Sequence, residues 1–226
     1  MTARRNNAFD LLRLFAALAV LYSHSFPLYG LEEPTILGKT VGTLAVAIFF
    51  AASGYLVTNS WNADKNINRF LQRRALRIFP GLAVAVIFTT FFAGAIDTNV
   101  TLSQYLTDTR TYAYLLNNLF LFASIPAPPG AFAGLPLEGA NGSLWTLRYE
   151  VLMYLLLLAL GVSRRLKALA PLAFGVCVIA WLILEYSDQS THLLKLPFLW
   201  RYGLYFDLHR IAFLGAYFFG GSILSL

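Results

Sequence analysis

Long apolar runs, separated by short polar segments, dominate the chain. A run of about 18 or more predominantly apolar residues is long enough to cross a lipid bilayer as a helix. Six runs meet this length: residues 8–27, 41–60, 77–96, 143–162, 168–186 and 207–226. A seventh, 112–125, is shorter and contains two asparagines, which favours a re-entrant or interfacial helix. The pattern predicts an all-α fold, a polytopic transmembrane helical bundle of about six spans plus one short helix that does not cross.

The composition is too apolar for a soluble globular protein. Of the 226 residues, 58% are hydrophobic and 12% are charged, whereas soluble domains average about 45–50% and about 25%. An integral membrane protein is therefore expected. The net charge of +6 does not indicate a nucleic-acid partner, because the basic residues lie between the apolar runs. The single cysteine, Cys177, excludes an internal disulfide and a multi-cysteine metal site, and we expect no bound metal.

Basic clusters predict the orientation in the membrane, because Lys and Arg in short loops remain in the cytoplasm. The clusters are Arg4 with Arg5, the segment 65–77 and the segment 164–167. All of them fall on one side of the bilayer if the run 112–125 does not cross. We therefore expect a multi-pass protein of the cell (inner) membrane with a cytoplasmic N-terminus. The segments expected outside are 28–40, 97–142 and 187–206.

The first apolar run contains three ionisable residues, in the sequence FDLLRLFAALAVLYSH at positions 9–24. Near the bilayer centre each costs on the order of 2.5–3.5 kcal/mol. At about 100° per residue, Asp10, Arg13 and His24 share one helix face, with Arg13 and His24 about 16 Å apart along the axis. This arrangement would suit a long substrate lying across the membrane. Taken singly, Arg13 could instead extend to the headgroups or pair with Asp10, and His24 could be an interfacial residue.

A basic segment, RFLQRRALRIFPG at residues 69–81, precedes the third apolar run. Arg74 and Arg77 are three residues apart, so they are neighbours on one helix face. Paired guanidinium groups at the cytoplasmic side can bind phosphates with planar, bidentate geometry. The alternative is simple anchoring of the helix at the cytoplasmic surface.

The fourth apolar run begins with GSLWTLRYEVLMYLL, at residues 142–156. Glu150 is expected roughly 10 Å below the outer surface, a depth at which a carboxylate indicates function. In the same leaflet as His24, it would fix the tautomer of the imidazole and stabilise its charged form. Arg148 is a competing partner for Glu150. Trp145 and Tyr149 are typical of an interfacial aromatic belt.

These segments, in this order, resemble the acyltransferase-3 family of membrane acyltransferases. A basic residue, ten residues and a histidine, the mark of the family, are matched by Arg13 and His24. FFAASGYLVTNSW, which contains Ser53, resembles the second-span segment of the family, although small residues there also suit helix packing. RRALRIFP matches the paired arginines of the family, and GSLWTLRYEVLMYLL matches its segment with a tryptophan and a glutamate.

The resemblance implies transfer of an acyl group, often acetyl, from cytoplasmic acyl-CoA to a hydroxyl of a cell-surface carbohydrate. By this resemblance, the coenzyme A contacts are Arg13, Arg74 and Arg77, the catalytic pair is His24 and Glu150, and the supporting residues are Asp10, Ser53 and Trp145. His24 would remove a proton from the acceptor hydroxyl, and an acyl-imidazole intermediate remains an open variant. Family members usually have more spans, so we interpret residues 1–226 as a single, incomplete acyltransferase domain.

Two other functions remain open on the sequence. Buried His, Glu and Asp also mark ion pathways, so a transporter or proton-relay protein is one alternative. Such proteins often contain inverted repeats with broken helices, and the sequence has no recognisable repeat. The other alternative is an inactive acyltransferase fragment that only binds or assembles in the membrane. The sequence leaves the oligomeric state open.

Overall fold

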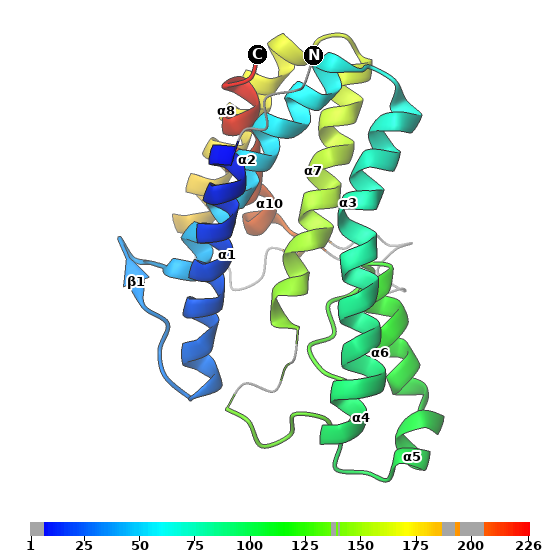
Figure 1. The fold of residues 1–226 in the computed structure, drawn as a ribbon. Coiled ribbons are helices and arrows are strands. Elements are labelled where there is room, and N and C mark those ends of the chain that lie inside the picture. Colours follow the sequence, from blue (N-terminus) through cyan, green and yellow to red (C-terminus); the bar gives the residue numbers. More distant parts are fainter. Residues whose placement is uncertain (1–6, 137–138, 140, 187–192, 195–205) are drawn as a thin grey trace. The chain divides into compact units, whose positions relative to one another are not determined.

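The computed structural model describes residues 7–136, 139, 141–186, 193–194 and 206–226 (Figure 1). Arg4, Arg5 and His192 lie outside the described residues. The longer helices are α1 (Asn7–Leu28), α2 (Val41–Ala63), α3 (Ile67–Phe88), α6 (Thr109–Leu119), α7 (Trp145–Val162), α8 (Leu166–Tyr186) and α10 (Leu208–Ile223). The short ones are α4 (Gly94–Asp97) and α5 (Leu102–Thr107), with a π-helical turn at Thr89–Ala93 and a 3-10 turn at Gly142–Leu144.

The helical bundle predicted from the apolar runs is confirmed. Among the described residues, 5 helices are long and apolar enough to cross a membrane. They are Ala8–Leu28, Val41–Ala63, Ile67–Asp97, Gly142–Val162 and Leu166–Tyr186, which correspond to the first five predicted spans. The sixth, α10, has 16 residues, slightly fewer than a span requires. The seventh run lies partly in α6, which has 11 residues and is shorter than a membrane span; whether this segment crosses remains a prediction.

The third helix begins earlier than its apolar run, at Ile67 rather than at residue 77. Asn66 caps it, because its side-chain oxygen accepts a hydrogen bond of 3.0 Å from the backbone N–H of Arg69. Hydropathy misses this start because arginine lowers the apolar score of a window while it favours a helix. As a result, Arg74 and Arg77 lie on a regular helix, about one turn apart.

The chain divides into two compact units, which are described separately. Unit 1 comprises Met1–Lys65, Leu155–Ser190 and His209–Leu226, and unit 2 comprises Asn66–Tyr154 and Thr191–Leu208. The division falls within α7, so the first part of this helix belongs to unit 2 and the rest to unit 1.

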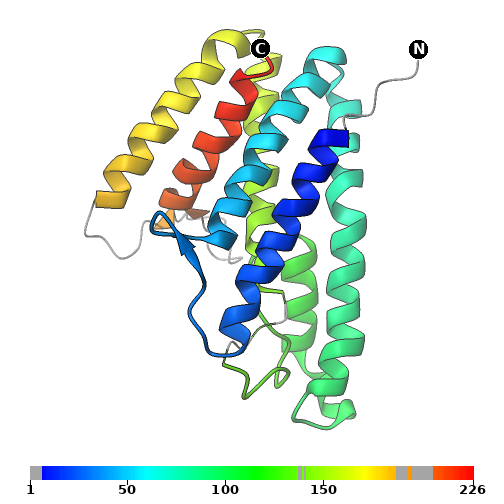
Figure 2. The ribbon, with the colours of Figure 1, turned by 60° about the vertical axis from the view of Figure 1, so that its left-hand side comes forward.

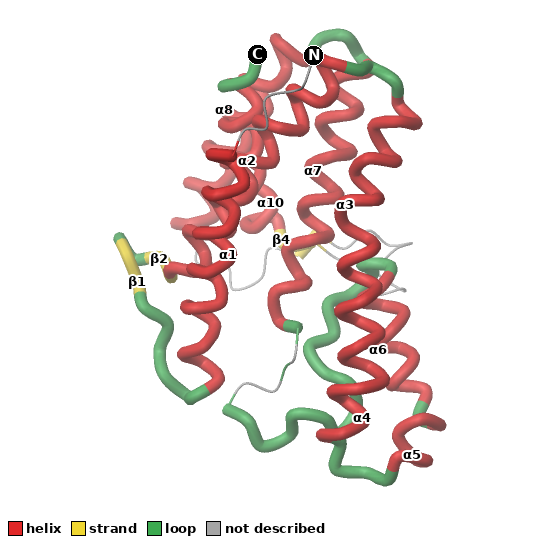
Figure 3. The backbone as a smooth tube through the Cα atoms, viewed as in Figure 1, coloured by secondary structure: helices red, strands yellow, loops and turns green. Residues whose placement is uncertain are grey.

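In unit 1, α1 lies beside α2 over much of its length (Figure 2). The rings of Phe9 and Tyr55 stack with their centroids 5.0 Å apart. The hairpin that joins the two helices pairs β1 (Thr35–Ile36) with β2 (Lys39–Thr40) in antiparallel register (Figure 3). Thr40 then caps α2, since its hydroxyl accepts a 3.1 Å hydrogen bond from the N–H of Thr43.

In unit 1, α2 and α10 approach each other closely. A side chain at Gly54 would overlap the carbonyl group of Phe218, and a side chain at Gly221 would overlap that of Ala51. The two backbones therefore touch directly, as small residues permit in membrane helices. Nearby, the hydroxyls of Thr58 and Ser222 form a buried hydrogen bond of 2.7 Å.

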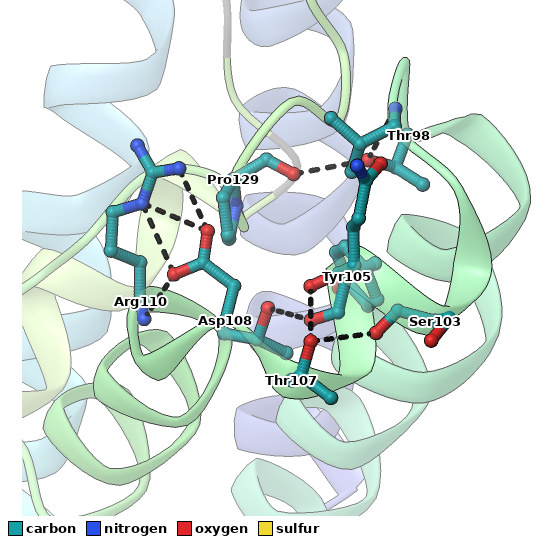
Figure 4. Close-up of polar contacts among 10 residues, drawn as sticks. Thr98, Ser103, Tyr105, Thr107, Asp108, Arg110 and Pro129 are labelled. Atoms are coloured by element: carbon teal, nitrogen blue, oxygen red, sulfur yellow. Dashed lines mark hydrogen bonds and ion pairs between the residues drawn. The ribbon is translucent and has the colours of Figure 1, made fainter.

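In unit 2, α6 packs against α3, and the loops at the end of α4 are fixed by polar contacts (Figures 1 and 4). The Tyr105 hydroxyl donates a 2.7 Å hydrogen bond to the carbonyl of Thr90. Burial of Tyr105 raises its pKa to about 12. The hydroxyl of Thr98 donates to the carbonyl of Pro129 at 3.1 Å. These contacts hold the Pro- and Gly-rich loop, which has no helix or strand between residues 124 and 136, as predicted.

Asp108 stands between α5 and α6 and serves as a cap for both (Figure 4). Its carboxylate accepts a 2.8 Å hydrogen bond from the N–H of Arg110 and pairs with the guanidinium of the same residue at 2.7 Å. The hydrogen bonds from Arg110 hold the pKa of Asp108 below its ordinary value. β3 (Leu193–Leu194) and β4 (Phe206–Asp207) form a second short antiparallel pair in this unit.

Candidate functional site

The first predicted site residues lie on α1, in unit 1. Arg13 and His24 are partly buried, and Asp10 is exposed in the first turn, where a carboxylate is favourable beside the helix N-terminus. The side chains that α1 buries most completely are Ala16, at 4% exposure, and Ser23, at 0%. The opposite face carries apolar side chains with more than half of their surface exposed: Leu11, Phe15, Leu18 and Tyr22. This face suits contact with lipid.

His24 has a carboxylate neighbour that the sequence analysis did not predict. Its Nδ1 lies 3.6 Å from Oε1 of Glu33, in the segment that follows α1. The other oxygen of Glu33 accepts a hydrogen bond from the hydroxyl of Ser23. The sequence signal was an adjacent pair of acidic residues just beyond the first apolar run. Pairing of His24 with Glu150 remains a prediction, because Glu150 belongs to unit 2.

Glu150 and Arg74, both in unit 2, share a contact residue that was also missed. The hydroxyl of Tyr154, one turn along α7, donates a hydrogen bond to the carboxylate of Glu150. The guanidinium of Arg74 lies 5.6 Å from the centre of the Tyr154 ring and 5.9 Å from that of Phe70. Tyr154 is 2% exposed. The structure therefore brings a predicted coenzyme A contact and a predicted catalytic residue together through one tyrosine.

Arg77 is exposed on α3, while Arg74 is partly buried. Arg73 precedes Arg74 directly in α3, and Arg77 follows it about one turn later. Like charges at this spacing along a helix repel, and a bound anion reduces the repulsion. This arrangement fits the expected role of Arg74 and Arg77 in phosphate binding, which remains a prediction. Arg13 belongs to unit 1, so its expected participation is also a prediction.

At the start of α7, Trp145 and Tyr149 belong to an aromatic cluster of unit 2. Their ring centroids are 5.6 Å apart, and the Tyr149 ring also lies 5.5 Å from that of Phe206. The Tyr149 hydroxyl accepts a 3.1 Å hydrogen bond from the N–H of Asp207. The interpretation of Tyr149 as an interfacial belt residue was wrong: it is 0% exposed, because β4 covers it. The supporting role of Trp145 remains a prediction.

Ser53 is buried in α2, at 4% exposure, next to the close contact between Gly54 and α10. This position agrees with a packing role, and its expected supporting role in the site remains a prediction.

A second polar cluster of unit 1 was not predicted. Glu185, near the end of α8, contacts Lys39 of β2 and accepts hydrogen bonds from Trp181 at 3.1 Å and His209 at 2.7 Å. The cluster thus connects the hairpin to α8 and α10. The sequence alone does not indicate a role for His209, because its partner Glu185 lies far away along the chain.

The fold and the polar residues within its helices define a multi-pass helical membrane protein. The model of the acyltransferase-3 family, described as an acyltransferase domain, matches residues 6–226. The chain therefore belongs to the acyltransferase-3 family, as the resemblance of its segments indicated.

Two curated relatives carry informative names. An "O-acetyl transferase" of Shigella phage Sf6 is 34% identical over 203 residues, which cover 88% of this chain and 59% of the relative. "Nodulation protein 10" of Rhizobium leguminosarum bv. viciae is 33% identical over 199 residues, which cover 83% of this chain and 53% of the relative. The chain thus spans little more than half the length of these relatives. No solved structure matches the chain.

Proposed function

We propose that the chain acts as an integral membrane O-acyltransferase. It moves an acyl group, in the simplest case acetyl, from cytoplasmic acyl-CoA to a hydroxyl of a cell-surface carbohydrate. The observation that carries the proposal is the family match across residues 6–226. The name of the phage relative, an O-acetyl transferase, supports acetyl as the group transferred.

Arg74 and Arg77 hold the phosphates of coenzyme A in this proposal, together with Arg13. The rings of Phe70 and Tyr154 beside the Arg74 guanidinium support this role, because they restrain a side chain that would otherwise lose rotamer freedom on binding. A planar guanidinium can then meet a phosphate with two parallel hydrogen bonds.

His24 acts as the general base. Its free ring nitrogen accepts the proton of the acceptor hydroxyl while the hydroxyl oxygen attacks the thioester carbonyl carbon. The resulting tetrahedral intermediate collapses with cleavage of the C–S bond, and the imidazolium returns the proton to the departing thiolate. The products are the acyl ester and free coenzyme A. Glu150 is the second catalytic residue of the proposal.

In this proposal the chain lies in the cell (inner) membrane with its N-terminus in the cytoplasm. Its partners are the lipid bilayer, acyl-CoA and a lipid-linked or surface glycan. The three basic clusters support this orientation, because Lys and Arg in short loops usually remain in the cytoplasm, where acyl-CoA is available.

The experiment compares cells that express the unsubstituted chain with cells that express His24→Ala. Mass spectrometry of surface glycans should show an added acyl mass with the unsubstituted chain. With His24→Ala this signal should fall by about 10²–10⁴-fold, the usual contribution of a general base. Equilibrium dialysis of the nanodisc-embedded proteins against radiolabelled acetyl-CoA should show binding that His24→Ala keeps and Arg74→Ala weakens.

Other outcomes identify the alternatives. Acetyl-CoA binding without any glycan acylation would indicate a fragment that binds but does not catalyse. Proton flux into liposomes, without acetyl-CoA binding, would indicate a proton-relay protein. Unchanged acylation with His24→Ala would contradict the role of His24.

A further inference from the structure

Glu33 is held in place by the turn that follows α1. The N–H of Leu31 donates a 3.0 Å hydrogen bond to the carbonyl of Phe26, and Gly30 takes a positive φ of 72° that reverses the chain. On the other side, the carbonyl of Pro34 accepts a 2.9 Å hydrogen bond from the N–H of Val41, the first residue of α2. Glu33 therefore returns toward the end of α1 with its backbone fixed on both sides.

The Glu33 carboxylate faces Ser23 and His24, near the end of α1. One oxygen accepts a hydrogen bond from the hydroxyl of Ser23, which is 0% exposed. The other lies 3.6 Å from Nδ1 of His24. The Glu33 side chain is 21% exposed, and that of His24 is 44% exposed. The buried serine thus sets the rotation of the carboxylate, and the second oxygen is directed at the imidazole.

Gly42 of α2 leaves the space that this arrangement needs. A Cβ atom at position 42 would lie 3.0 Å from the Ser23 hydroxyl oxygen and 3.4 Å from the Glu33 carboxylate. A side chain there would press on the contact between Glu33 and Ser23. Helices α1 and α2 and the segment between them therefore all contribute to the position of the carboxylate.

We propose that Glu33 is a positioning residue that holds His24 in the tautomer protonated at Nδ1. This proposal rests on the proposed function, because it concerns the same histidine. A carboxylate opposite Nδ1 favours a proton on that nitrogen and leaves Nε2 as the free base. The separation of 3.6 Å exceeds a hydrogen bond, and such contacts often shorten only when substrate binds. Glu33 thereby takes the orienting role that the sequence assigned to Glu150.

Imidazole nitrogen shifts test this assignment without any need for turnover. The full chain, labelled with ¹⁵N-histidine, is placed in nanodiscs, and His24→Ala identifies the His24 signals. We expect the Nδ1–H tautomer to dominate for His24 in the unsubstituted chain and to lose this dominance with Glu33→Gln. Ser23→Ala, which releases the carboxylate from its anchor, should weaken the preference. Glu32→Gln removes an exposed neighbouring charge and should leave the spectrum unchanged.

Kinetic measurements distinguish a positioning role of Glu33 from a role in substrate binding. Glu33→Gln should lower kcat for acyl transfer by on the order of 10–100-fold while the KM for acetyl-CoA changes little. Glu33→Asp should recover part of this loss, because it restores a carboxylate.

Specific results overturn the proposal. The proposal is wrong if Glu33→Gln leaves the imidazole nitrogen shifts of His24 unchanged. It is also wrong if the tautomer preference responds to Glu150→Gln and not to Glu33→Gln. If the unsubstituted chain transfers no acyl group, the proposed function fails, and the nitrogen shifts still decide the role of Glu33. Thermal unfolding shows whether Glu33→Gln still folds. If it does not, the His24 nitrogen shifts of Ser23→Ala test the proposal instead.

Discussion

At the scale of single residues, Tyr154 contacts two of the predicted site residues of unit 2. It donates to the carboxylate of Glu150, and its ring lies against the guanidinium of Arg74. A hydrogen bond to a charged group within a helical bundle contributes about 1.5–3 kcal/mol. One side chain therefore contacts the carboxylate through its hydroxyl and the cation through its ring, and substitution can remove the hydroxyl while it keeps the ring.

Tyr154→Phe should remove the hydroxyl contact with Glu150 and keep the ring beside Arg74. We expect the free energy of unfolding to fall by about 1–3 kcal/mol, because the Glu150 carboxylate loses a donor, while acetyl-CoA binding through Arg74 is retained. Tyr154→Leu should weaken acetyl-CoA binding as well. Thermal unfolding in detergent and equilibrium dialysis measure the two effects.

The control for this pair is Tyr112→Phe, which removes an exposed hydroxyl whose hydrogen bond reaches only the carbonyl of Leu106. It should change neither measurement. Equal acetyl-CoA affinities for Tyr154→Phe and Tyr154→Leu would contradict the role assigned to the ring.

At the scale of helices and loops, the α2–α10 contact gives a direct test of packing. Gly54→Ala should destabilise the protein, because the new methyl group overlaps the backbone of Phe218. Overpacking of this kind typically costs about 1–3 kcal/mol. Gly175→Ala is a matched control in α8, where a Cβ meets nothing within 4 Å, and it should stabilise the helix by about 0.5–1 kcal/mol. Thermal unfolding that ranks the two variants in the opposite order would contradict the contact.

The junction between α5 and α6 should respond to acid. Arg110 lowers the pKa of Asp108 in the folded chain, so the unfolded state binds this proton more readily. The stabilisation is therefore fully present above the unfolded pKa of Asp108, about 3.9, and is lost as the pH falls through the lower folded value. Because the pair is exposed, the effect should be small.

The measurement compares melting temperatures between pH 5 and pH 2 for the unsubstituted chain and for Asp108→Asn. The difference between them should shrink as the pH falls. Glu32→Gln should follow the unsubstituted chain throughout. A difference that stays constant over this range would show that the Asp108 carboxylate is not stabilised by Arg110.

At the scale of the whole molecule, the sequence predicted the helices better than their connections. Apolar length is a property of each segment alone, so the first five apolar runs all correspond to helices long enough to cross a membrane. The start of α3 at Ile67 was missed because its first turns are basic. Burial of Tyr149 was missed because β4, which covers it, is distant in sequence.

In the candidate site, too, the sequence predicted single residues better than their tertiary contacts. Arg13, His24 and Glu150 could be proposed because charges within apolar runs are conspicuous. Arg74 and Arg77 could be proposed because they are neighbours on one helix face in a basic segment. Tyr154 and Glu33 could not, since a tyrosine is ordinary in such a run and Glu33 lies outside one. Their significance depends on which atoms fold onto Glu150 and His24, and this is decided by tertiary packing.

The predicted topology of the molecule can be tested with its single cysteine removed. In a Cys177→Ser background, Glu32→Cys places a thiol in the exposed segment after α1, and Lys65→Cys places one in the exposed segment after α2. If the basic clusters lie in the cytoplasm, a membrane-impermeant maleimide added to intact cells should label Glu32→Cys and not Lys65→Cys. Both should react after permeabilisation. The reverse pattern would place His24 and Glu33 at the cytoplasmic surface, on the same side as acyl-CoA and away from a surface glycan, and it would contradict the proposed direction of acyl transfer.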